Sequence, residues 1–406
     1  MKAGDTQTPH RIALVTGGLP FGGSTTFLVN FAGELVRRKI PVKVLSLEWD
    51  NPLGGDFQKQ NIPLTRFDDR KMILEDRLSA TLRELADFQP TVIAATLGSV
   101  SFEILRYVPP GVFRIGMGQS DDPNVYNMMR RYTQWMDLAA MVSQGMKQKV
   151  SAMPEYAKVP VAYLPLGVPM CAAEEIPARN PSAPLRILYL GRLGREQKRV
   201  HLFPEILKHL RASGMPFEWT IAGEGEERSH LEANLKSESP HQTVTFTGPI
   251  PYAEVSALLK RHDIYLLASD YEGLPLSLLE AMGHGLVPVV SDLKSGIPEV
   301  VDTVNGMLVP IHETAGYANA IFHLHQHREE WAAKSAAART RVVREFSVAA
   351  MADRWLGAFP NPPGTKAVWP KRFSVKAPLE AEKAFYFSPP VRILRRAARL
   401  MKSGRN

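Results

Sequence analysis

Short apolar runs alternate with stretches of helical periodicity along the first part of the chain. The run Ile12–Thr16 leads into a glycine-rich turn at 17–23, a helical pattern over Ser24–Arg38 and a second run at Val42–Ser46. Further strands are predicted at Thr91–Ala95, Phe113–Met117, Leu138–Val142 and Val159–Tyr163. A strand, glycine turn, helix and strand in this order open a doubly wound α/β sheet, so we expect one Rossmann-like domain over residues 1–175.

The same alternation restarts after residues 171–184, whose Pro, Ala and polar residues have the composition of a linker. Strands are predicted at Arg186–Leu190, Glu218–Ala222, Val244–Phe246, Ile264–Ala268 and Val287–Val290, with a helix over about 199–213. Gly, Ser or Asp stands at the C-terminal ends of these strands, where open α/β sheets bind ligands. We therefore predict a second Rossmann-like domain over 176–345 that faces the first across an interdomain cleft.

The pattern changes again towards the C-terminus. Residues 346–360 contain an amphipathic helix, predicted over Phe346–Phe359. The tail, 361–406, is first rich in proline and aromatic residues and then becomes helical over Val391–Lys402. Apolar residues of this last helix share one face and arginines occupy most of the rest, as in a helix that lies on a membrane surface.

Composition limits the class of protein. With 406 residues, 45% hydrophobic and 22% charged, the chain has the profile of a soluble globular protein. Its single cysteine, Cys171, excludes internal disulfides and cysteine metal sites and fits a reducing compartment. No run approaches the roughly 18 apolar residues of a membrane span, and the first residues lack a signal-peptide core. We expect a location in the cytoplasm or on the inner face of the cytoplasmic membrane.

The net charge of +8 is concentrated in the tail. Residues 361–406 carry eleven Lys/Arg and two Glu, a balance of +9, which leaves −1 for residues 1–360. A neutral body argues against a nucleic-acid partner, because a groove that neutralises many phosphates needs a local excess of cations. The basic tail instead suggests contact with an anionic membrane. A solvated tail, or a helix packed on the first domain or on a partner, is the alternative.

One stretch, Ser269–Met282, combines two carboxylates with a helix start. The predicted strand before it ends at Ala268, and Pro275 can start the helix that follows. Unpaired amides and the positive end of the helix dipole then meet there, so the backbone of Leu274–Ser277 can receive an anion. Glu272 lies beside that site and Glu280 two turns deeper, although two glutamates eight residues apart are common by chance.

The surrounding motifs make the stretch more specific. They occur in one order and register: Gly191-Arg192-Leu193 with Lys198, the run from Ala222 to Glu227, residues 245–250, Glu272–Met282, Gly285–Val290 and Gly296–Val301. This set resembles the family 4 retaining glycosyltransferases of the GT-B fold, the glycosyl transferases group 1, most clearly over about 185–345.

The resemblance implies a role for each matching residue. Arg192 and Lys198 correspond to the cations on the donor diphosphate, where a guanidinium and an ammonium can neutralise the leaving group. Glu272 corresponds to the contact with the donor-sugar hydroxyls and Glu280 to the contact with the ribose. The remaining donor-binding candidates are backbone positions of the two domains: Gly22, Gly23, Pro249, Ile250, Gly273, Leu274, Pro275, Leu276 and Ser277.

The first domain departs from the family at one point. Members often present a histidine at a strand end near the anomeric carbon, but this chain has none between His10 and His201. Gln119, Ser120 and Asp121 occupy the matching neighbourhood and are the acceptor-side candidates; an ordinary polar loop is the alternative. A retaining transfer in which the leaving phosphate takes the acceptor proton needs no such base.

The resemblance predicts a metal-independent retaining glycosyltransferase with no cofactor. The donor is a nucleotide diphosphate sugar, and the acceptor is a hydroxyl of a glycan or lipid-linked intermediate of cell-envelope or exopolysaccharide synthesis. The alternatives are a non-catalytic GT-B-like protein that binds a nucleotide sugar or glycan as a scaffold, and a GT-B-fold sugar-nucleotide epimerase.

Overall fold

The computed structural model describes residues 10–49, 54–180, 182–235, 240–294, 296–376, 378–379 and 393–398. The chain forms two compact units. Unit 1 comprises Met1–Met141, Lys147–Leu164 and Ala352–Asn406, and unit 2 comprises Val142–Met146 and Pro165–Met351. Each unit is therefore assembled from separate pieces of sequence. The predicted division at 175/176 stays a prediction.

Unit 1 is built on a parallel sheet with the order β3-β2-β1-β4-β5-β6-β7 within the described part of the chain. Its strands are β1 Ile12–Thr16, β2 Val42–Ser46, β3 Leu64–Arg66, β4 Val92–Thr96, β5 Phe113–Gly118, β6 Leu138–Met141 and β7 Val161–Tyr163. The central strand β1 pairs in register with β2 and β4, so that Ile12 lies between Val42 and Val92. Every residue of β1 and β4 is buried, as expected for a parallel sheet with helices on both faces.

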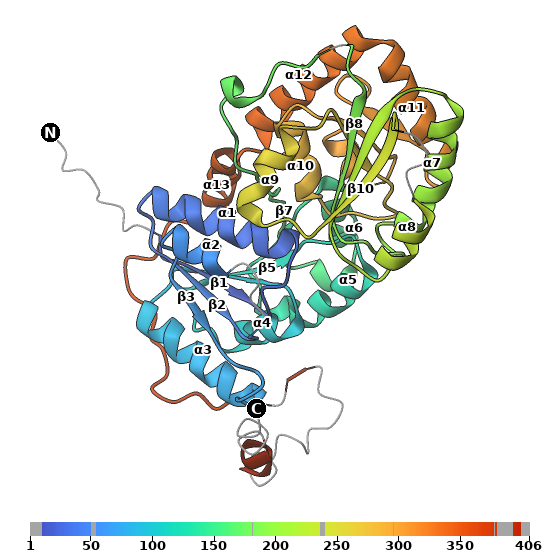
Figure 1. Cartoon of the computed structure of the whole chain (residues 1–406). Coiled ribbons are helices and arrows are strands. Elements are labelled where there is room, and N and C mark those ends of the chain that lie inside the picture. The colour runs from blue at the N-terminus through green and yellow to red at the C-terminus, as the bar shows by residue number, and fades with distance from the viewer. Residues whose placement is uncertain are drawn as a thin grey trace, which may run out of the picture. The chain divides into compact units, whose positions relative to one another are not determined.

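The helices between these strands lie on both faces of the sheet, with α1 and α3 on opposite sides (Figure 1). They are α1 Gly23–Arg37, α2 Gly54–Lys59, α3 Leu74–Phe88, α4 Ser99–Glu103, α5 Pro123–Met129 and α6 Gln144–Ser151. The late helix α13, Val348–Gly357, also contributes to this unit: Trp355 is fully buried against Phe27 and Phe31 of α1, at ring distances of 5.4 and 5.2 Å.

Unit 2 repeats the architecture with the strand order β10-β9-β8-β11-β12-β13, again parallel throughout the described residues. Its strands are β8 Leu185–Leu190, β9 Phe217–Ala222, β10 Gln242–Gly248, β11 Ile264–Leu267, β12 Val287–Ser291 and β13 Met307–Val309. Its helices are α7 Phe203–Ala212, α8 Arg228–Asn234, α9 Tyr252–Leu259, α10 Leu276–Gly283, α11 Thr314–Gln326 and α12 Arg328–Glu345. The apolar side chains of α10 at Leu278, Leu279 and Met282 are fully buried.

The strands predicted from the apolar runs are confirmed, and their ends agree with the structure to within two residues. The structure adds β3 and β13, three-residue strands at the sheet edges that the pattern did not predict. Residues 393–398 of the predicted tail helix are helical, and the rest of Val391–Lys402 lies outside the described residues. Among the helices that the structure describes, none is both long and apolar enough to span a bilayer.

Candidate active site

The candidate donor-site residues of unit 2 gather at the C-terminal ends of two neighbouring strands. β8 ends at Leu190, shortly before Arg192, and β11 ends at Leu267, shortly before Glu272. The two strands pair directly and run parallel, so both loops leave the sheet at the same edge. This topology brings together residues that are far apart in the sequence. Lys198 and Glu272, for example, are 74 positions apart and form a hydrogen bond.

Lys198 and Glu272 form an ion pair of 2.5 Å that is shielded from solvent, with side chains 14% and 6% exposed. The same carboxylate oxygen, Oε1, accepts a 2.7 Å hydrogen bond from the hydroxyl of Ser269. This oxygen is thus oriented by two donors from two different loops. Because a buried charge needs such partners, each of the two ions fixes the position of the other.

Gln197 connects the two loops, a role that the sequence did not reveal. Its backbone carbonyl accepts from the amide of Asp270 at 2.9 Å, and its Nε2 donates to the carbonyl of Tyr271 at 3.2 Å and to Glu272 Oε2 at 3.4 Å. Its own Oε1 accepts from a guanidinium nitrogen of Arg192 at 3.3 Å. Gln197 therefore bridges the predicted cation Arg192 and the predicted acid Glu272.

Arg192 is an exposed residue whose backbone is anchored to the buried strand β8. Its carbonyl accepts a 2.6 Å hydrogen bond from the hydroxyl of Tyr189, a residue of β8 that is completely buried. Burial raises the pKa of Tyr189, so the phenol remains a neutral donor. The loop is thus anchored from below while the guanidinium stays available to bind an anion.

Two glycines let the loops of this edge pack backbone against backbone. Gly223, which follows β9, has φ 143°, and a Cβ there would lie 1.8 Å from the carbonyl oxygen of Gly191. Gly296, which follows β12, has φ 71°, and its Cβ would lie 2.2 Å from the carbonyl oxygen of Gly273. Only glycine fits both the conformation and the space, so these two glycines allow the loops that carry Arg192 and Glu272 to pack closely against their neighbours.

The predicted helix start is confirmed: α10 begins at Leu276, directly after Pro275. The first amides of a helix have no acceptor within it, which leaves the backbone at Leu276 and Ser277 free to bind an anion. Ser277 is held by a 2.7 Å hydrogen bond between its hydroxyl and that of Tyr265. Gly273 and Leu274, which precede the helix, are buried.

Glu280 lies in the second turn of α10 and is 8% exposed. Burial raises the pKa of its carboxyl from 4.5 to about 8. Within the described part of the chain, no hydrogen bond or ion pair engages this carboxyl. A buried polar group of this kind is costly unless a partner arrives, which makes Glu280 suited to the hydroxyls of a ligand.

The remaining candidates lie elsewhere. Pro249 and Ile250 follow β10, one of the two edge strands of the sheet described for unit 2; Pro249 is exposed and Ile250 is half-buried. Gly22 and Gly23 stand exposed at the start of α1 in unit 1, where Gly22 has φ 137°.

The acceptor-side candidates follow β5 of unit 1. The carboxylate of Asp121 accepts from the hydroxyl of Tyr126 at 2.6 Å and pairs with Lys149 at 2.6 Å, so its charge is already compensated. Ser120 is half-buried. Gln119 donates to the sulfur of Met117 at 3.4 Å, whereas its buried Oε1 has no hydrogen-bond partner among the described residues. Gln119 therefore has a buried hydrogen-bond acceptor that a ligand could use.

Known proteins resemble both the sequence around this edge and the fold. Residues 184–327 match the family model of glycosyl transferases group 1. This segment, about a third of the chain, is similar to that family. It contains Arg192, Lys198, Glu272 and Glu280, together with the loops that position them. The narrower assignment to family 4 stays a prediction.

Two curated relatives extend the group 1 match. The chain is 33% identical over 195 residues to the putative colanic acid biosynthesis glycosyltransferase WcaL of Escherichia coli (strain K12), which covers 46% of this chain and 48% of that protein. It is 36% identical over 171 residues to the amylovoran biosynthesis glycosyltransferase AmsK of Erwinia amylovora, covering 40% and 42%. The chain thus spans about half the length of the curated relatives it matches.

Solved structures share the fold at low sequence identity. TarM superposes with a TM-score of 0.70 at 13% identity over 87% of this chain and 99% of that chain. HepE of Anabaena, solved in complex with UDP, superposes with a TM-score of 0.68 at 15% identity over 86% and 98%. The predicted fold class, two Rossmann-like α/β domains of the GT-B type, is confirmed.

Proposed function

We propose that the protein is a retaining glycosyltransferase that moves a sugar from a nucleoside diphosphate sugar onto an acceptor hydroxyl. The observation that carries the proposal is the pairing of Lys198 with Glu272 beside the exposed Arg192, at the edge of the sheet where α10 begins. One carboxylate for sugar hydroxyls, two cations for a diphosphate and a helix N-terminus are assembled there from separate loops. The group 1 family of residues 184–327 supports the same activity.

In the proposed reaction, the bond between the anomeric carbon and the β-phosphate oxygen breaks as the acceptor hydroxyl forms the new glycosidic bond. The acceptor proton passes to the departing phosphate oxygen. Negative charge grows on that phosphate, and Arg192 and Lys198, with the amides at Leu276 and Ser277, neutralise it. Glu272 orients the sugar and Glu280 the ribose. With these donors in place we propose that neither a metal ion nor a cofactor is required.

The acceptor is proposed from the relatives. WcaL is named for colanic acid biosynthesis and AmsK for amylovoran biosynthesis, and the Salmonella typhimurium relative, at 28% identity, is named a lipopolysaccharide 1,6-galactosyltransferase. We infer that this chain also glycosylates a glycan or lipid-linked intermediate of an exopolysaccharide or envelope polymer. The group 1 family and the assembled charges favour an enzyme over a non-catalytic scaffold.

Contact of the tail with an anionic membrane belongs to the same proposal, with the inner face of the cytoplasmic membrane as the site of action. The balance of +9 over residues 361–406 supports it. Ile393 and Leu394 support it further, because these apolar side chains are 65% and 68% exposed on a helical segment of the tail. Arg395 and Arg396 of the same segment pair with Glu75 and Asp76 of α3, so they hold the segment on unit 1.

The test is donor turnover in EDTA. Nucleoside diphosphate sugars are screened for hydrolysis or transfer, and the product anomer is read by NMR. Turnover that persists in EDTA with retention of the anomeric configuration is expected. Inversion would contradict the retaining mechanism, and restoration of lost turnover by manganese or magnesium would contradict metal independence. Thermal stabilisation by a nucleotide without turnover would favour the scaffold, and an epimerised nucleotide sugar would favour the epimerase.

A further inference from the structure

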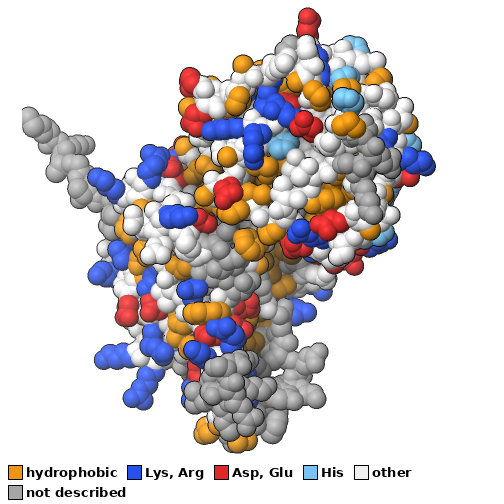
Figure 2. Space-filling view, viewed as in Figure 1, with side chains coloured by type: hydrophobic (Ala, Val, Ile, Leu, Met, Phe, Trp, Pro, Cys, Tyr) orange, Lys and Arg blue, Asp and Glu red, His pale blue; other side chains and the backbone are white. Residues whose placement is uncertain are grey.

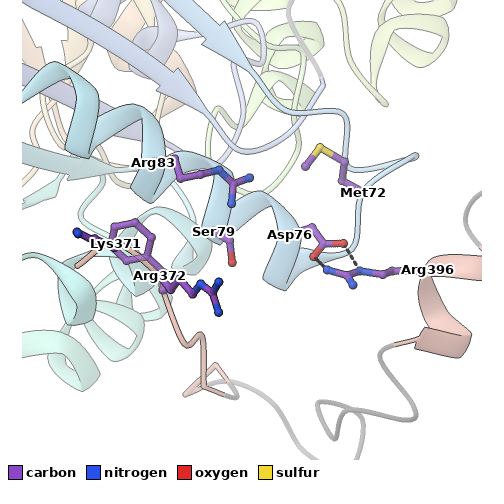
Figure 3. A pocket seen from close by; sticks show the side chains of 8 residues that line it. Met72, Asp76, Ser79, Arg83, Lys371, Arg372 and Arg396 are labelled. Atoms are coloured by element: carbon purple, nitrogen blue, oxygen red, sulfur yellow. Dashed lines mark hydrogen bonds and ion pairs between the residues drawn. The ribbon is translucent and has the colours of Figure 1, made fainter. Parts of the chain in front are cut away.

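A second site lies on unit 1, far in sequence from the donor site. It is a pocket of about 470 Å³ between α3 and two segments of the tail (Figure 3). From α3 come Asp76, Ser79 and Arg83, whose spacing of three and four residues places them on one face of the helix. The rest of the lining is Met72, Lys371, Arg372, Phe373 and Arg396.

The charges of this pocket are unbalanced. Four cations line it against one carboxylate, Asp76, and that carboxylate is bound by Arg396 at 2.6 Å. No ion pair or hydrogen bond engages the side chains of Arg83, Lys371 or Arg372 within the part of the chain that the structure describes. In Figure 3, Arg83 and Arg372 end near the Ser79 side chain, whereas Arg396 is turned towards Asp76. Three positive charges without a partner among the described residues therefore line one cavity.

The tail segments that build the pocket are fixed to unit 1. Arg395 pairs at 2.9 Å with Glu75, which is 1% exposed, and Arg396 pairs with Asp76. Further along the tail, the amide of Lys376 donates to the hydroxyl of Tyr107 at 2.9 Å, and the amide of Leu379 donates to Glu103 at 3.3 Å. These contacts hold the cations of the tail beside Arg83, so the pocket is a built feature of the surface.

We propose that this pocket binds a phosphate group, and that the phosphate belongs to the headgroup of an anionic lipid. The two guanidinium groups of Arg83 and Arg372 can each grip phosphate oxygens bidentately, and Lys371 adds a compact charge. The lipid source follows from Ile393 and Leu394, which are exposed on the same helical segment as Arg396. Lys and Arg side chains also gather on the surface around α3 (Figure 2). This inference rests on the membrane contact proposed above, for which the pocket supplies a binding site for the lipid headgroup.

The test compares two triple variants of the full-length protein with the same loss of charge. The pocket variant is Arg83→Gln, Lys371→Gln and Arg372→Gln. The matched control is Lys158→Gln, Arg261→Gln and Lys366→Gln, exposed cations outside the pocket. Each is measured for sedimentation with phosphatidylcholine vesicles with and without phosphatidylglycerol, and for pyrophosphate binding by calorimetry. Any binding of pyrophosphate at the donor site is common to both variants and cancels in the comparison.

We expect the pocket variant to lose at least about tenfold in affinity for phosphatidylglycerol vesicles and for pyrophosphate, and the control to lose less than about threefold. A loss confined to pyrophosphate would overturn the lipid source in favour of a soluble phosphate. Equal losses in both variants would overturn the pocket and leave a solvated basic face. The variant Arg83→Lys with Arg372→Lys keeps the charge but not the forks, so we expect an intermediate loss; wild-type affinity would contradict bidentate binding. Nucleotide binding at the donor site is read separately and tests the proposed function alone.

Discussion

Lys198 and Glu272 form a shielded ion pair, so their substitution should affect both the transfer rate and the stability of the fold. Each charged contact to a diphosphate or sugar is typically worth roughly 1.5–3 kcal/mol, and about 1.4 kcal/mol is a factor of ten in rate. We therefore expect Arg192→Ala, Lys198→Ala and Glu272→Gln each to lower transfer at least about tenfold. Arg261→Ala, an exposed arginine of the same unit, is the control and should retain wild-type rates.

The stability of these variants should differ as well. Lys198→Ala leaves a buried carboxylate without its cation, a loss that costs roughly 3–5 kcal/mol when nothing compensates, and here Ser269 offsets part of it. Arg192 is exposed, so Arg192→Ala should leave the melting temperature unchanged. Wild-type transfer rates in all three purified variants would contradict the site assignment, whatever their melting temperatures.

Glu280 should make the stability of unit 2 depend on pH. Its folded pKa of about 8 exceeds the ordinary 4.5, so between these values the folded state holds a proton that the unfolded state has lost. Stability from this group is therefore lost as pH rises from 4.5 to about 8, by at most about 1.4 kcal/mol per pH unit.

The variant Glu280→Gln replaces the titrating carboxyl with a neutral amide and so isolates the effect. Its free energy of unfolding relative to the wild type should rise steadily between pH 5 and pH 8 in urea titrations. A difference that stays constant over this range would show that the carboxyl does not titrate there.

Sequence reasoning reached the charged residues of the site but not their supports. A single sequence is enough to recognise the ordered motifs that contain Arg192, Lys198, Glu272 and Glu280. Gln197, Ser269 and Tyr189 carry no such signal, because their roles depend on which loops the sheet brings together. Their proximity to predicted residues in sequence was the one clue available, since Gln197 precedes Lys198 directly.

At the scale of elements, the apolar runs predicted the interior strands because strands buried on both faces are nearly continuous in hydrophobicity. The edge strands β3 and β13, of three residues each, were not predicted, whereas the equally short edge strand β7 was, within the apolar run Val159–Tyr163. The start of α10 at Pro275 was predictable from local chemistry, whereas the packing of one loop on another was not. That packing depends on glycine at positions that the sequence alone does not distinguish from other turn glycines.

Replacement of such a loop glycine should disturb the site through the backbone. Gly223→Ala would force a Cβ to within 1.8 Å of the Gly191 carbonyl at φ 143°, so either the loop moves or the unit is destabilised. We expect a lower melting temperature and weaker nucleotide binding. Gly357→Ala, at a helical glycine with no heavy atom within 4 Å of its Cβ, is the control and should be neutral or stabilising. Equal behaviour of the two variants would contradict this account.

At the scale of the whole molecule, the tail should contribute apolar contacts to membrane binding in addition to charge. Burial of a side chain such as Ile393 or Leu394 is worth roughly 1.5–3 kcal/mol. The double variant Ile393→Gln and Leu394→Gln should therefore lose at least about tenfold in partitioning to anionic vesicles, at unchanged pyrophosphate affinity. Val368→Gln removes a tail side chain that is 87% exposed and serves as the control. Loss of partitioning in the control to the same degree would remove the special role of residues 393 and 394.

The way in which the chain is shared between the units has a practical consequence for dissecting the protein. Unit 1 takes up the chain again at Ala352, and the Trp355 that follows fills the space beside Phe27 and Phe31. A gene fragment that stops before α13 would encode a unit 1 whose core lacks Trp355. A fragment that starts after the linker would contain Trp355 without the residues of α1 on which it packs. No single cut yields either half intact, so the protein has to be expressed, mutated and assayed as one piece.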